Sequence, residues 1–401
     1  MLPCHEYGAA CMRVLYYCPE YYCLHGGRTH ARGFYGALQR LSSVSGSFLY
    51  PRADPQDESR HGSGHAVSRD KLRFLPNAIR QIIRFFIPRR ELTRKVIGEL
   101  VANRCNVLVI RTGFKQPIVR KIKKECPGIT VCLEINSAYF DESFTGLPLR
   151  SFFQKMEVMR FRSADAFVVV SSYLKSYLVT RKIPAEKILV NQNGVNIGTI
   201  DLAGVKDVKE EYGIPANTFV IGYIGGMETF RRLPEVINYF AELRRKGDDD
   251  LYFLIVGDGI DMHAVKAAIE ADKDILRDSV KLAGWQDQSQ LCRFLRTFDL
   301  AIFPFTNDYC SPLKLFEYLG AGIPTIGPDT STVREVFEEG VHLKLVKQDG
   351  SNFISTVLEL KAGTQLRNRL ANRGRQLVLD KYTWKNNAER VVEHIQYIRH
   401  Q

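Results

Sequence analysis

Two series of short apolar segments, separated by helical patterns, constrain the fold of this chain more than any other feature. The first series consists of 12–18, 106–111, 129–135 and 166–171, and the second of 219–226, 251–257, 279–284, 300–305 and 324–327. Near-continuous apolar strands that alternate with helices are typical of parallel sheets covered by helices on both faces. Two such series in 401 residues predict an α/β chain with two doubly wound, Rossmann-like domains.

Composition between these segments indicates the limits of the domains. The first domain is expected over 12–198 and the second over 199–380, because a polar, glycine-containing stretch divides the two series. A helical apolar period follows over 381–401. The segment 43–65 is rich in Ser, Gly, Pro and His and is expected to be a loop, as is the segment that holds His25 and His30.

The positive charge of the chain is concentrated in one segment. Residues 69–124 contain sixteen Lys and Arg and three acidic residues, whereas the whole chain has a net charge of +12. The remainder is therefore almost neutral. An anionic partner is implied for one part of the first domain.

Within that segment, residues 69–100 combine arginines with Leu, Ile and Phe, and Pro76 and Pro88 are expected to interrupt its helical pattern. Cations beside an apolar face indicate a helix that lies in an anionic membrane surface. An anionic soluble acceptor and an ordinary solvated face are the alternatives. Nucleic acid is not expected, because no recognised nucleic-acid module accompanies these residues.

The stretch SPLKLFEYLGAGIP at 311–324 begins like a helix, with Ser311 as N-cap and Pro312 in the first helical position. Lys314 then lies beside the positive end of the helix dipole, which is unfavourable by up to about 1 kcal/mol. A bound anion would make this arrangement favourable, and a diphosphate suits a helix N-terminus with a fixed cation. Glu317, on the same helix face, could accept hydrogen bonds from sugar hydroxyls such as those of ribose. A solvated Lys–Glu pair is the alternative.

Three glycine-containing or polar loops follow strands of the second domain, at 225–232, 257–261 and 307–314. Ligands of open α/β sheets bind at such carboxyl ends of strands. None of the loops carries a dinucleotide fingerprint or a P-loop, which disfavours a Rossmann dehydrogenase and a P-loop ATPase. Asp258, between two glycines, fits a ligand loop and a tight turn equally well.

The segment 311–327 resembles the nucleotide-sugar motif of glycosyltransferase family 4, whose members have the GT-B fold of two facing Rossmann-like domains. The likeness extends in order through 25–34, 163–175, 191–197, 221–226, 255–259 and 280–285. In GT-B proteins a C-terminal helix crosses back to the first domain, and the resemblance implies this role for 381–401. The nucleotide diphosphate sugar is then the donor substrate.

The resemblance also implies roles for single residues. Arg231 stands where the family has a phosphate-binding lysine, Lys314 belongs to the diphosphate loop, and Glu317 matches the ribose-binding glutamate. The donor is expected to contact Gly26, Gly27, Gly225, Gly226, Asp258, Ser311, Pro312 and Glu317. The expected catalytic residues are Arg231, Lys314 and Glu134. Glu134 and Asn136 fall near the place of a family histidine beside the reacting sugar, although a strand-end residue without a catalytic role is an alternative for Glu134.

The chain departs from the family pattern at three places. Tyr309 replaces a glutamate that usually contacts the transferred sugar, Gly226 stands where the family often has an arginine, and no histidine occurs between His65 and His263. The function expected from the resemblance is retaining transfer, without a protein nucleophile, to a glycan or lipid-linked acceptor in polysaccharide or glycolipid synthesis. A non-catalytic GT-B partner subunit and a GT-B epimerase or hydrolase are the alternatives.

Cofactors are not expected. Arg231, Lys314 and helix N-termini supply the positive charge that a metal would supply, and the nine cysteines form no C-x-x-C pair. No apolar run approaches the ~18 residues of a membrane span, and no secretory signal pattern begins the sequence. We therefore expect a cytoplasmic protein, peripherally associated with the inner face of a membrane.

Overall fold

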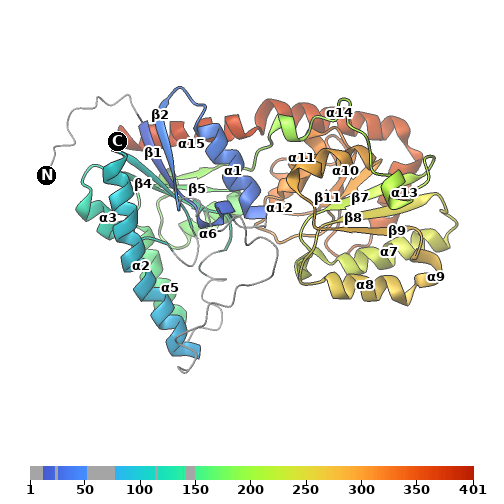
Figure 1. Ribbon diagram of the computed structural model, residues 1–401, viewed down its shortest axis with the longest axis horizontal. Coiled ribbons are helices and arrows are strands. Elements are labelled where there is room, and N and C mark those ends of the chain that lie inside the picture. The colour runs from blue at the N-terminus through green and yellow to red at the C-terminus, as the bar shows by residue number, and fades with distance from the viewer. Residues whose placement is uncertain (1–11, 23–25, 52–76, 113–115, 139, 141–149) are drawn as a thin grey trace. The chain divides into compact units, whose positions relative to one another are not determined.

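The computed structural model describes residues 12–22, 26–51, 77–112, 116–138, 140 and 150–401, with the side chains of 77–88 excepted (Figure 1). Clustering of contacts divides the chain into two compact units. Unit 1 consists of residues 1–191 and 388–401, and unit 2 of residues 192–387. The division lies a few residues before the expected boundary at 198.

Unit 1 contains a six-stranded parallel sheet in the order β2-β1-β3-β4-β5-β6. The strands are β1 (Met12–Tyr17), β2 (Val44–Tyr50), β3 (Val107–Arg111), β4 (Thr130–Ile135), β5 (Ala166–Val169) and β6 (Ile188–Val190). The four strands expected from the sequence are all present and occupy the centre of the sheet. The expectation of a loop at 43–65 is wrong for Val44–Tyr50, which pairs in parallel with β1, and residues 52–65 lie outside the described part.

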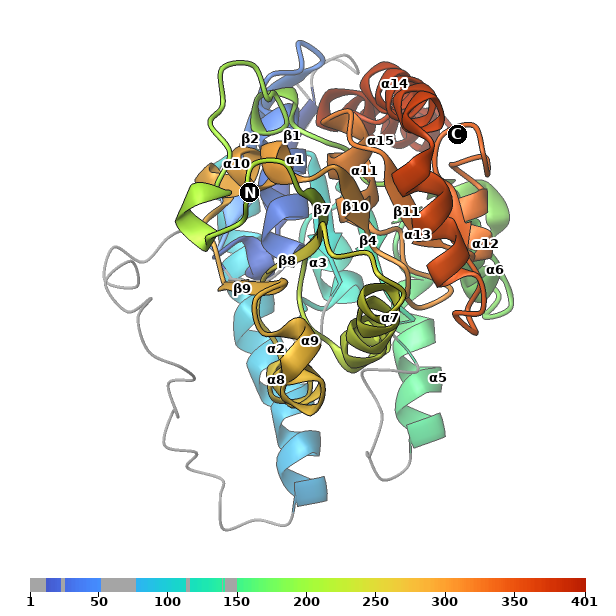
Figure 2. The ribbon, with the colours of Figure 1, turned by 90° about the vertical axis from the view of Figure 1, so that its right-hand side faces the viewer.

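The helices of unit 1 include two that depart from expectation. They are α1 (Gly26–Leu38), α2 (Asn77–Ala102), α3 (Val119–Glu125), α5 (Arg150–Phe161) and α6 (Ser172–Val179). Helix α1 starts at Gly26, so the described part of the segment that was expected to be a loop, including His30, is helical. Helix α2 continues through Pro88, and its N-terminal part extends away from the sheet (Figures 1 and 2).

Unit 2 contains a second six-stranded parallel sheet, in the order β12-β11-β10-β7-β8-β9. Its strands are β7 (Phe219–Ile224), β8 (Leu251–Val256), β9 (Val280–Gly284), β10 (Leu300–Ile302), β11 (Thr325–Pro328) and β12 (Lys344–Val346). All five strands expected from the sequence are confirmed. The two parallel sheets confirm the predicted α/β class.

Helices cover both faces of the second sheet. They are α7 (Leu233–Arg245), α8 (Met262–Ala271), α9 (Lys273–Leu276), α10 (Leu291–Thr297), α11 (Leu313–Gly320), α12 (Ser331–Arg334), α13 (Phe353–Ala362) and α14 (Thr364–Lys381). Helices α7, α8 and α9 lie on one face, and α11 and α14 pack together on the other (Figures 1 and 2). This cover explains why the strands between them are apolar throughout.

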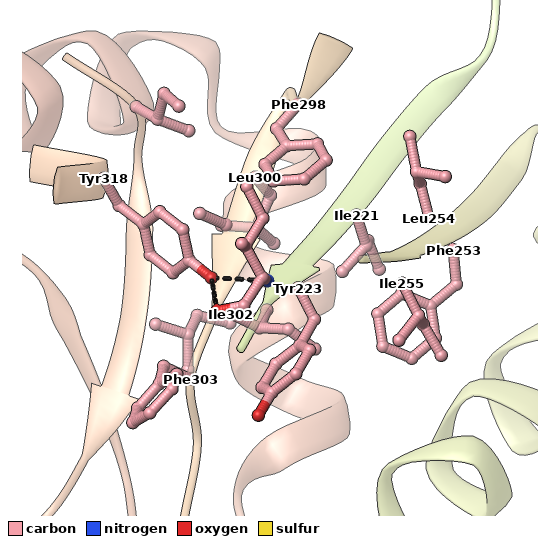
Figure 3. Packing of buried hydrophobic residues seen from close by; sticks show 14 of the residues in the cluster. Ile221, Tyr223, Phe253, Leu254, Ile255, Phe298, Leu300, Ile302, Phe303 and Tyr318 are labelled. Atoms are coloured by element: carbon pink, nitrogen blue, oxygen red, sulfur yellow. Dashed lines mark hydrogen bonds between the residues drawn. The ribbon is translucent and has the colours of Figure 1, made fainter. Parts of the chain in front are cut away.

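The core of unit 2 is closed by a tyrosine of α11. The hydroxyl of Tyr318 accepts a hydrogen bond from the backbone N–H of Ile224 at 2.7 Å and donates one to the carbonyl of the same residue at 3.0 Å (Figure 3). Tyr318 is fully buried. It therefore holds the second half of α11 against the carboxyl end of β7, and its hydroxyl is fully paired.

The last helix, α15 (Trp384–Arg399), begins in unit 2, and its residues from Ala388 onward belong to unit 1. Within unit 1, Arg390 Nε donates a hydrogen bond to Asn191 Oδ1 at 2.8 Å, and His394 Nε2 lies 3.0 Å from the Lys187 carbonyl oxygen. Polar contacts thus accompany the apolar face of the helix, which includes buried Val391 and Ile395.

Candidate functional site

Two glycine loops meet at the carboxyl ends of β7 and β8. A Cβ atom on Gly257, whose φ is +138°, would lie 1.9 Å from the carbonyl oxygen of Gly225, and one on Gly259 would lie 2.6 Å from the Met227 nitrogen. These loops leave no room for side chains. Gly225 and Gly226 therefore stand in a crowded backbone turn at the end of the strand where ligands of such sheets bind.

Asp258 is exposed and lies between these glycines. Its Oδ1 accepts the N–H of Gly259 at 2.8 Å, and its carbonyl oxygen accepts the N–H of Met227 at 3.1 Å. The first bond is local to the loop, and the second joins it to the loop that follows β7. A ligand loop and a tight turn, the two interpretations open from the sequence, both agree with these bonds.

Helix α11 begins one residue later than the sequence suggests. Pro312 is the cap residue, with extended backbone angles and no side-chain hydrogen bond, and Lys314 is the second helical residue. The expected capping by Ser311 is therefore wrong. Because Pro312 itself has extended backbone angles, the helix starts after it and Ser311 lies one residue outside the cap position. Ser311 is buried, and its Oγ has no hydrogen-bond partner in the described part of the chain.

Lys314 and Glu317 form an ion pair in the first turns of α11. The Nζ of Lys314 lies 2.6 Å from Oε2 of Glu317, whose side chain is only 3% exposed, whereas that of Lys314 is 23% exposed. The interpretation as a solvated pair is therefore wrong for the carboxylate, which is buried. The lysine keeps part of its surface open, next to the unpaired hydroxyl of Ser311.

The cation of Arg231 is fixed by the segment after β10. Its Nη1 donates to Thr306 Oγ1 at 2.8 Å, and its guanidinium lies 4.3 Å from the ring centre of Phe303 and 4.5 Å from that of Phe230. The side chain is 13% exposed. Aromatic stacking and the threonine bond restrain the planar group, which is then a fixed positive charge at this edge of the sheet.

The hydroxyl of Tyr318 is affected by the charges of both Glu317 and Arg231. Burial raises the pKa of Tyr318 well above its ordinary value, Glu317 raises it further, and Arg231 acts in the opposite direction. Both charged groups therefore lie within range of one buried hydroxyl. Arg231 and Glu317 belong to the same end of the unit 2 sheet.

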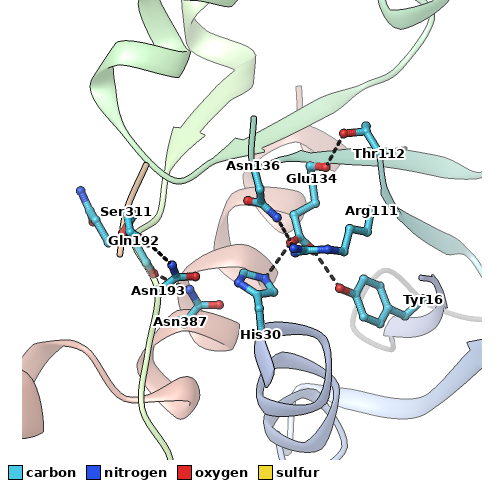
Figure 4. A network of polar contacts seen from close by, with 10 residues as sticks. All are labelled: Tyr16, His30, Arg111, Thr112, Glu134, Asn136, Gln192, Asn193, Ser311 and Asn387. Carbon is cyan, nitrogen blue, oxygen red and sulfur yellow. Dashed lines mark hydrogen bonds and ion pairs between the residues drawn. The ribbon is translucent and has the colours of Figure 1, made fainter. Parts of the chain in front are cut away.

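The asparagine-rich loop at 191–197 supports the segment before α11. The Nδ2 of Asn193 donates to the carbonyl oxygen of Ser311 at 2.7 Å, and the Nδ2 of Asn387 donates to the carbonyl oxygen of Gln192 at 2.7 Å (Figure 4). Asn193 is buried. The several asparagines in this loop could have indicated such a role from sequence, because buried amides commonly form hydrogen bonds with backbone groups.

In unit 1 four polar residues surround the carboxylate of Glu134, and together with it they form what we call the Glu134 network: Tyr16, His30, Arg111, Glu134 and Asn136 (Figure 4). Oε1 of Glu134 accepts from Arg111, from Asn136 Nδ2 at 2.7 Å and from His30 Nε2 at 2.7 Å. Oε2 accepts from the hydroxyl of Tyr16 at 3.0 Å.

Strand register assembles the Glu134 network. Arg111 pairs with Glu134 across β3 and β4, and Tyr16 pairs with Val109 across β1 and β3. Because side chains alternate along a strand, Tyr16, Arg111 and Glu134 point to one face of the sheet. Helix α1 adds His30, which is buried, so the expectation of a surface-loop histidine is wrong; His25 lies outside the described residues.

The network keeps Glu134 ionised. Burial alone would raise the pKa of this carboxyl, but the charges of His30 and Arg111 and the bonds from His30 and Asn136 hold it well below its ordinary value. Both oxygens already accept hydrogen bonds, and the residue is 4% exposed. A carboxylate so enclosed is suited to orienting its partners.

Gly26 and Gly27 are the first two residues of α1. The expectation of a glycine loop is therefore corrected to a helix N-terminus, which offers backbone N–H groups to an anion.

The basic segment is only partly a surface. Arg89 is 2% exposed, and its Nη1 donates to Oε1 and Oε2 of Glu157 at 3.0 and 2.9 Å. This buried pair joins α2 to α5, and Gln116 also donates to Glu157 at 2.5 Å. Arg89 is thus not a surface cation. Arg90 and Arg94 are exposed, whereas the side chains of Arg80 and Arg84 lie outside the described residues.

In the described residues, no group of three or more His, Cys, Asp and Glu side chains could hold a metal ion. The acidic run 248–250 instead contacts Lys361, with Asp248 Oδ1 at 2.7 Å. In the same residues, none of the helices is long and apolar enough to cross a membrane.

Comparison with known proteins agrees with this geometry. Residues 218–362 match the family model of glycosyl transferases group 1. The lipopolysaccharide 1,2-N-acetylglucosaminetransferase of Salmonella typhimurium is 22% identical over 295 residues, which cover 72% of each chain.

Two solved structures share the fold along nearly the whole chain. A glycosyltransferase from Rickettsia africae superposes with a TM-score of 0.71 at 14% identity, covering 96% of this chain and 98% of that one. HepE of Anabaena in complex with UDP gives a TM-score of 0.69 at 15% identity, covering 96% of this chain and 100% of that one. The chain therefore has the GT-B fold of these solved glycosyltransferases, and its residues 218–362 match the family model of glycosyl transferases group 1.

Proposed function

We propose that this protein transfers a sugar, with retention of the anomeric configuration, from a nucleotide diphosphate sugar to a glycan or lipid-linked acceptor. The observation that carries the proposal is the start of α11. A partly open lysine, a buried carboxylate and an unpaired buried hydroxyl occupy one helix N-terminus at the ligand-binding edge of a sheet. A diphosphate would accept hydrogen bonds from the lysine and the hydroxyl, and a ribose hydroxyl would donate to Glu317.

The proposed chemistry uses fixed cations. As the bond between the anomeric carbon and the diphosphate oxygen breaks, the electron pair passes to that oxygen, and Arg231 and Lys314 stabilise the growing negative charge. The acceptor oxygen attacks from the same face, and its proton passes to the departing oxygen. The products are the glycosylated acceptor and the nucleoside diphosphate. No covalent intermediate with the protein is required, and the enclosed Glu134 acts by positioning.

The biological setting is proposed from the relatives and from the charge. The Salmonella relative is named for lipopolysaccharide and N-acetylglucosamine, and HepE has been solved with UDP-glucose. These names support UDP-N-acetylglucosamine and UDP-glucose as the first donors to test, and surface polysaccharide or lipopolysaccharide synthesis as the process.

Contact with an anionic membrane surface remains part of the proposal. The exposed cations Arg90 and Arg94 on α2 support it, and Arg89 does not contribute because it is buried. Location at the inner face of the membrane follows from this contact and from the cytoplasmic supply of nucleotide sugars.

A non-catalytic partner subunit is the second candidate, favoured by Tyr309 in the place of the sugar-contacting glutamate. The Tyr309 hydroxyl accepts from Asn307 Nδ2 at 3.0 Å, so a side chain of different chemistry is ordered there. Incubation of the purified protein with radiolabelled donor and a membrane extract distinguishes the two. An enzyme forms a labelled product whose anomeric configuration can be assigned, whereas an inert subunit forms none.

A further inference from the structure

One half of the Asn136 amide is bonded and the other half is not. Its Nδ2 donates to Oε1 of Glu134 at 2.7 Å. Its Oδ1 is buried and has no hydrogen-bond partner in the described part of the chain. Figure 4 shows the nitrogen directed at the carboxylate and the oxygen on the opposite side of the amide.

Chemistry fixes this orientation. An ionised carboxylate can only accept hydrogen bonds, so the amide must present its NH₂ group to Glu134. If the amide turned over, Oδ1 would face a carboxylate that is held ionised by Arg111 and His30. The Glu134 network therefore determines that Asn136 directs a hydrogen-bond acceptor away from the carboxylate.

An acceptor that has lost water without gaining a donor is unfavourable in the free protein. Asn136 directly follows β4, a central strand of the unit 1 sheet, at its carboxyl end. Ligands of α/β sheets bind at this end. The position and the unpaired oxygen together indicate a ligand that brings a hydrogen-bond donor.

The surroundings limit the chemical class of that ligand. A carbonyl oxygen beside a carboxylate would repel a phosphate. The charge of Glu134 is already balanced by the guanidinium of Arg111, so the site does not require a further cation. A neutral donor remains, and in a glycosyltransferase the abundant neutral donor is a sugar hydroxyl.

We infer that Asn136 is a substrate-binding residue whose Oδ1 accepts a hydrogen bond from a sugar hydroxyl, and that Glu134 is the positioning residue that sets the orientation of the amide. This inference rests on the proposed function, because it takes the ligand to be a carbohydrate. The hydroxyl can belong to the donor sugar or to the acceptor, and the two sources give different kinetic signatures.

The first experiment separates these sources. In full-length Asn136→Ala, a donor-sugar contact weakens binding of UDP-glucose by about 3- to 10-fold and leaves binding of UDP unchanged. An acceptor contact leaves both affinities unchanged and raises the KM of the acceptor by a similar factor. Asn103→Ala, which removes another amide of unit 1 that contacts Glu99, is the matched control and should change neither value.

A second pair of variants tests the positioning role. Asn136→Asp alone places two carboxylates together, and activity should fall. In the double variant Asn136→Asp/Glu134→Gln, the amide nitrogen at position 134 donates to the carboxylate at position 136. The second carboxylate oxygen at position 136 still faces the ligand. The double variant should therefore recover part of the lost kcat/KM, which a purely structural role for Glu134 would not produce.

A deoxygenated substrate completes the test. Removal of the contacted hydroxyl should weaken binding to the wild type and have no further effect in Asn136→Ala. Equal donor affinity and equal acceptor KM in wild type and folded Asn136→Ala would overturn the assignment. Sugar binding that depends on Asn136 without any transfer would instead contradict the proposed function and leave this assignment standing.

Discussion

The Nζ of Lys314 lies 2.6 Å from Oε2 of Glu317, one helical turn further along α11. The carboxylate is buried and the ammonium is partly open, so the two charges have different surroundings. Removal of the lysine would strand a buried carboxylate, whereas removal of the carboxylate would leave a cation that water can reach. The two residues should therefore respond differently to substitution.

The first prediction concerns turnover. Replacing Lys314 or Arg231 by Ala should reduce kcat by about 2–4 kcal/mol of transition-state stabilisation, because each cation is proposed to stabilise charge that grows on the leaving diphosphate. Steady-state kinetics with calorimetric donor binding measures the two effects separately. Lys314→Ala/Glu317→Gln, which strands no carboxylate, controls for loss of folding. Full activity in Lys314→Ala would show that α11 merely has an unusual first turn.

The second prediction concerns Glu317→Gln. A contact with ribose is similar in the ground state and the transition state, so this change should weaken donor binding more than it reduces kcat. Titration with UDP and with 2′-deoxy-UDP distinguishes a ribose contact, since these two ligands differ only in one ribose hydroxyl. Unchanged donor affinity in a folded Glu317→Gln protein would contradict the ribose assignment.

Metal independence is the third prediction. Transfer should continue in EDTA, because Arg231 and Lys314 are proposed to supply the positive charge that a divalent ion would otherwise supply. The measurement is initial rate with donor and acceptor before and after chelation. A loss of activity that Mg²⁺ or Mn²⁺ restores would contradict the proposal for these two cations.

Vesicle binding is the fourth prediction. Replacing Arg80, Arg84, Arg90 and Arg94 by Gln should release the protein from anionic vesicles, and salt should weaken binding of the wild type because exposed charges are screened over about 8–10 Å. The matched control replaces four exposed cations of unit 2, Lys246, Lys266, Lys273 and Arg277. If the α2 substitutions and the unit 2 substitutions released the protein from vesicles equally, binding would depend on total charge and α2 would not be a membrane-binding surface.

Arg89 is left out of that set because of its buried ion pair with Glu157. Removal of one partner of such a pair typically costs about 3–5 kcal/mol of stability. An Arg89 variant would thus lose vesicle binding through unfolding, for a reason unrelated to the membrane.

The central strands of both sheets could be predicted from sequence because they are covered on two faces and are apolar throughout. The strands that were not predicted from the sequence are β2, β6 and β12. Each forms an edge of its sheet or is only three residues long, so its sequence need not be uniformly apolar. β2 also contains Gly46 and two serines, which favoured a loop. The hydrophobic pattern therefore located the central strands of both sheets and one edge strand, β9, and missed the other three edge strands.

The sequence could predict only those contacts of the candidate site that join residues close together in the chain. Lys314 and Glu317 are one helical turn apart, so their proximity follows from helix geometry. Glu134 contacts Tyr16, which is 118 residues away, and His30, which lies on a helix where a loop was expected. These contacts depend on strand order and register, which a single sequence does not encode locally. Residue type alone could therefore nominate Glu134 and Asn136 without revealing their partners.

Acid stability is the last prediction. The folded pKa of Glu134 lies below its ordinary value of 4.5, because the interactions with His30, Arg111 and Asn136 outweigh the effect of burial. Its contribution to stability is therefore complete above about pH 4.5 and is lost as the pH falls towards the folded pKa. Urea unfolding between pH 6 and pH 3 should show a smaller loss of stability in Glu134→Gln than in the wild type. Glu210→Gln, at a side chain that is 85% exposed, is the control and should follow the wild type. Parallel curves for all three proteins would mean that the charge of Glu134 is not stabilised by its network.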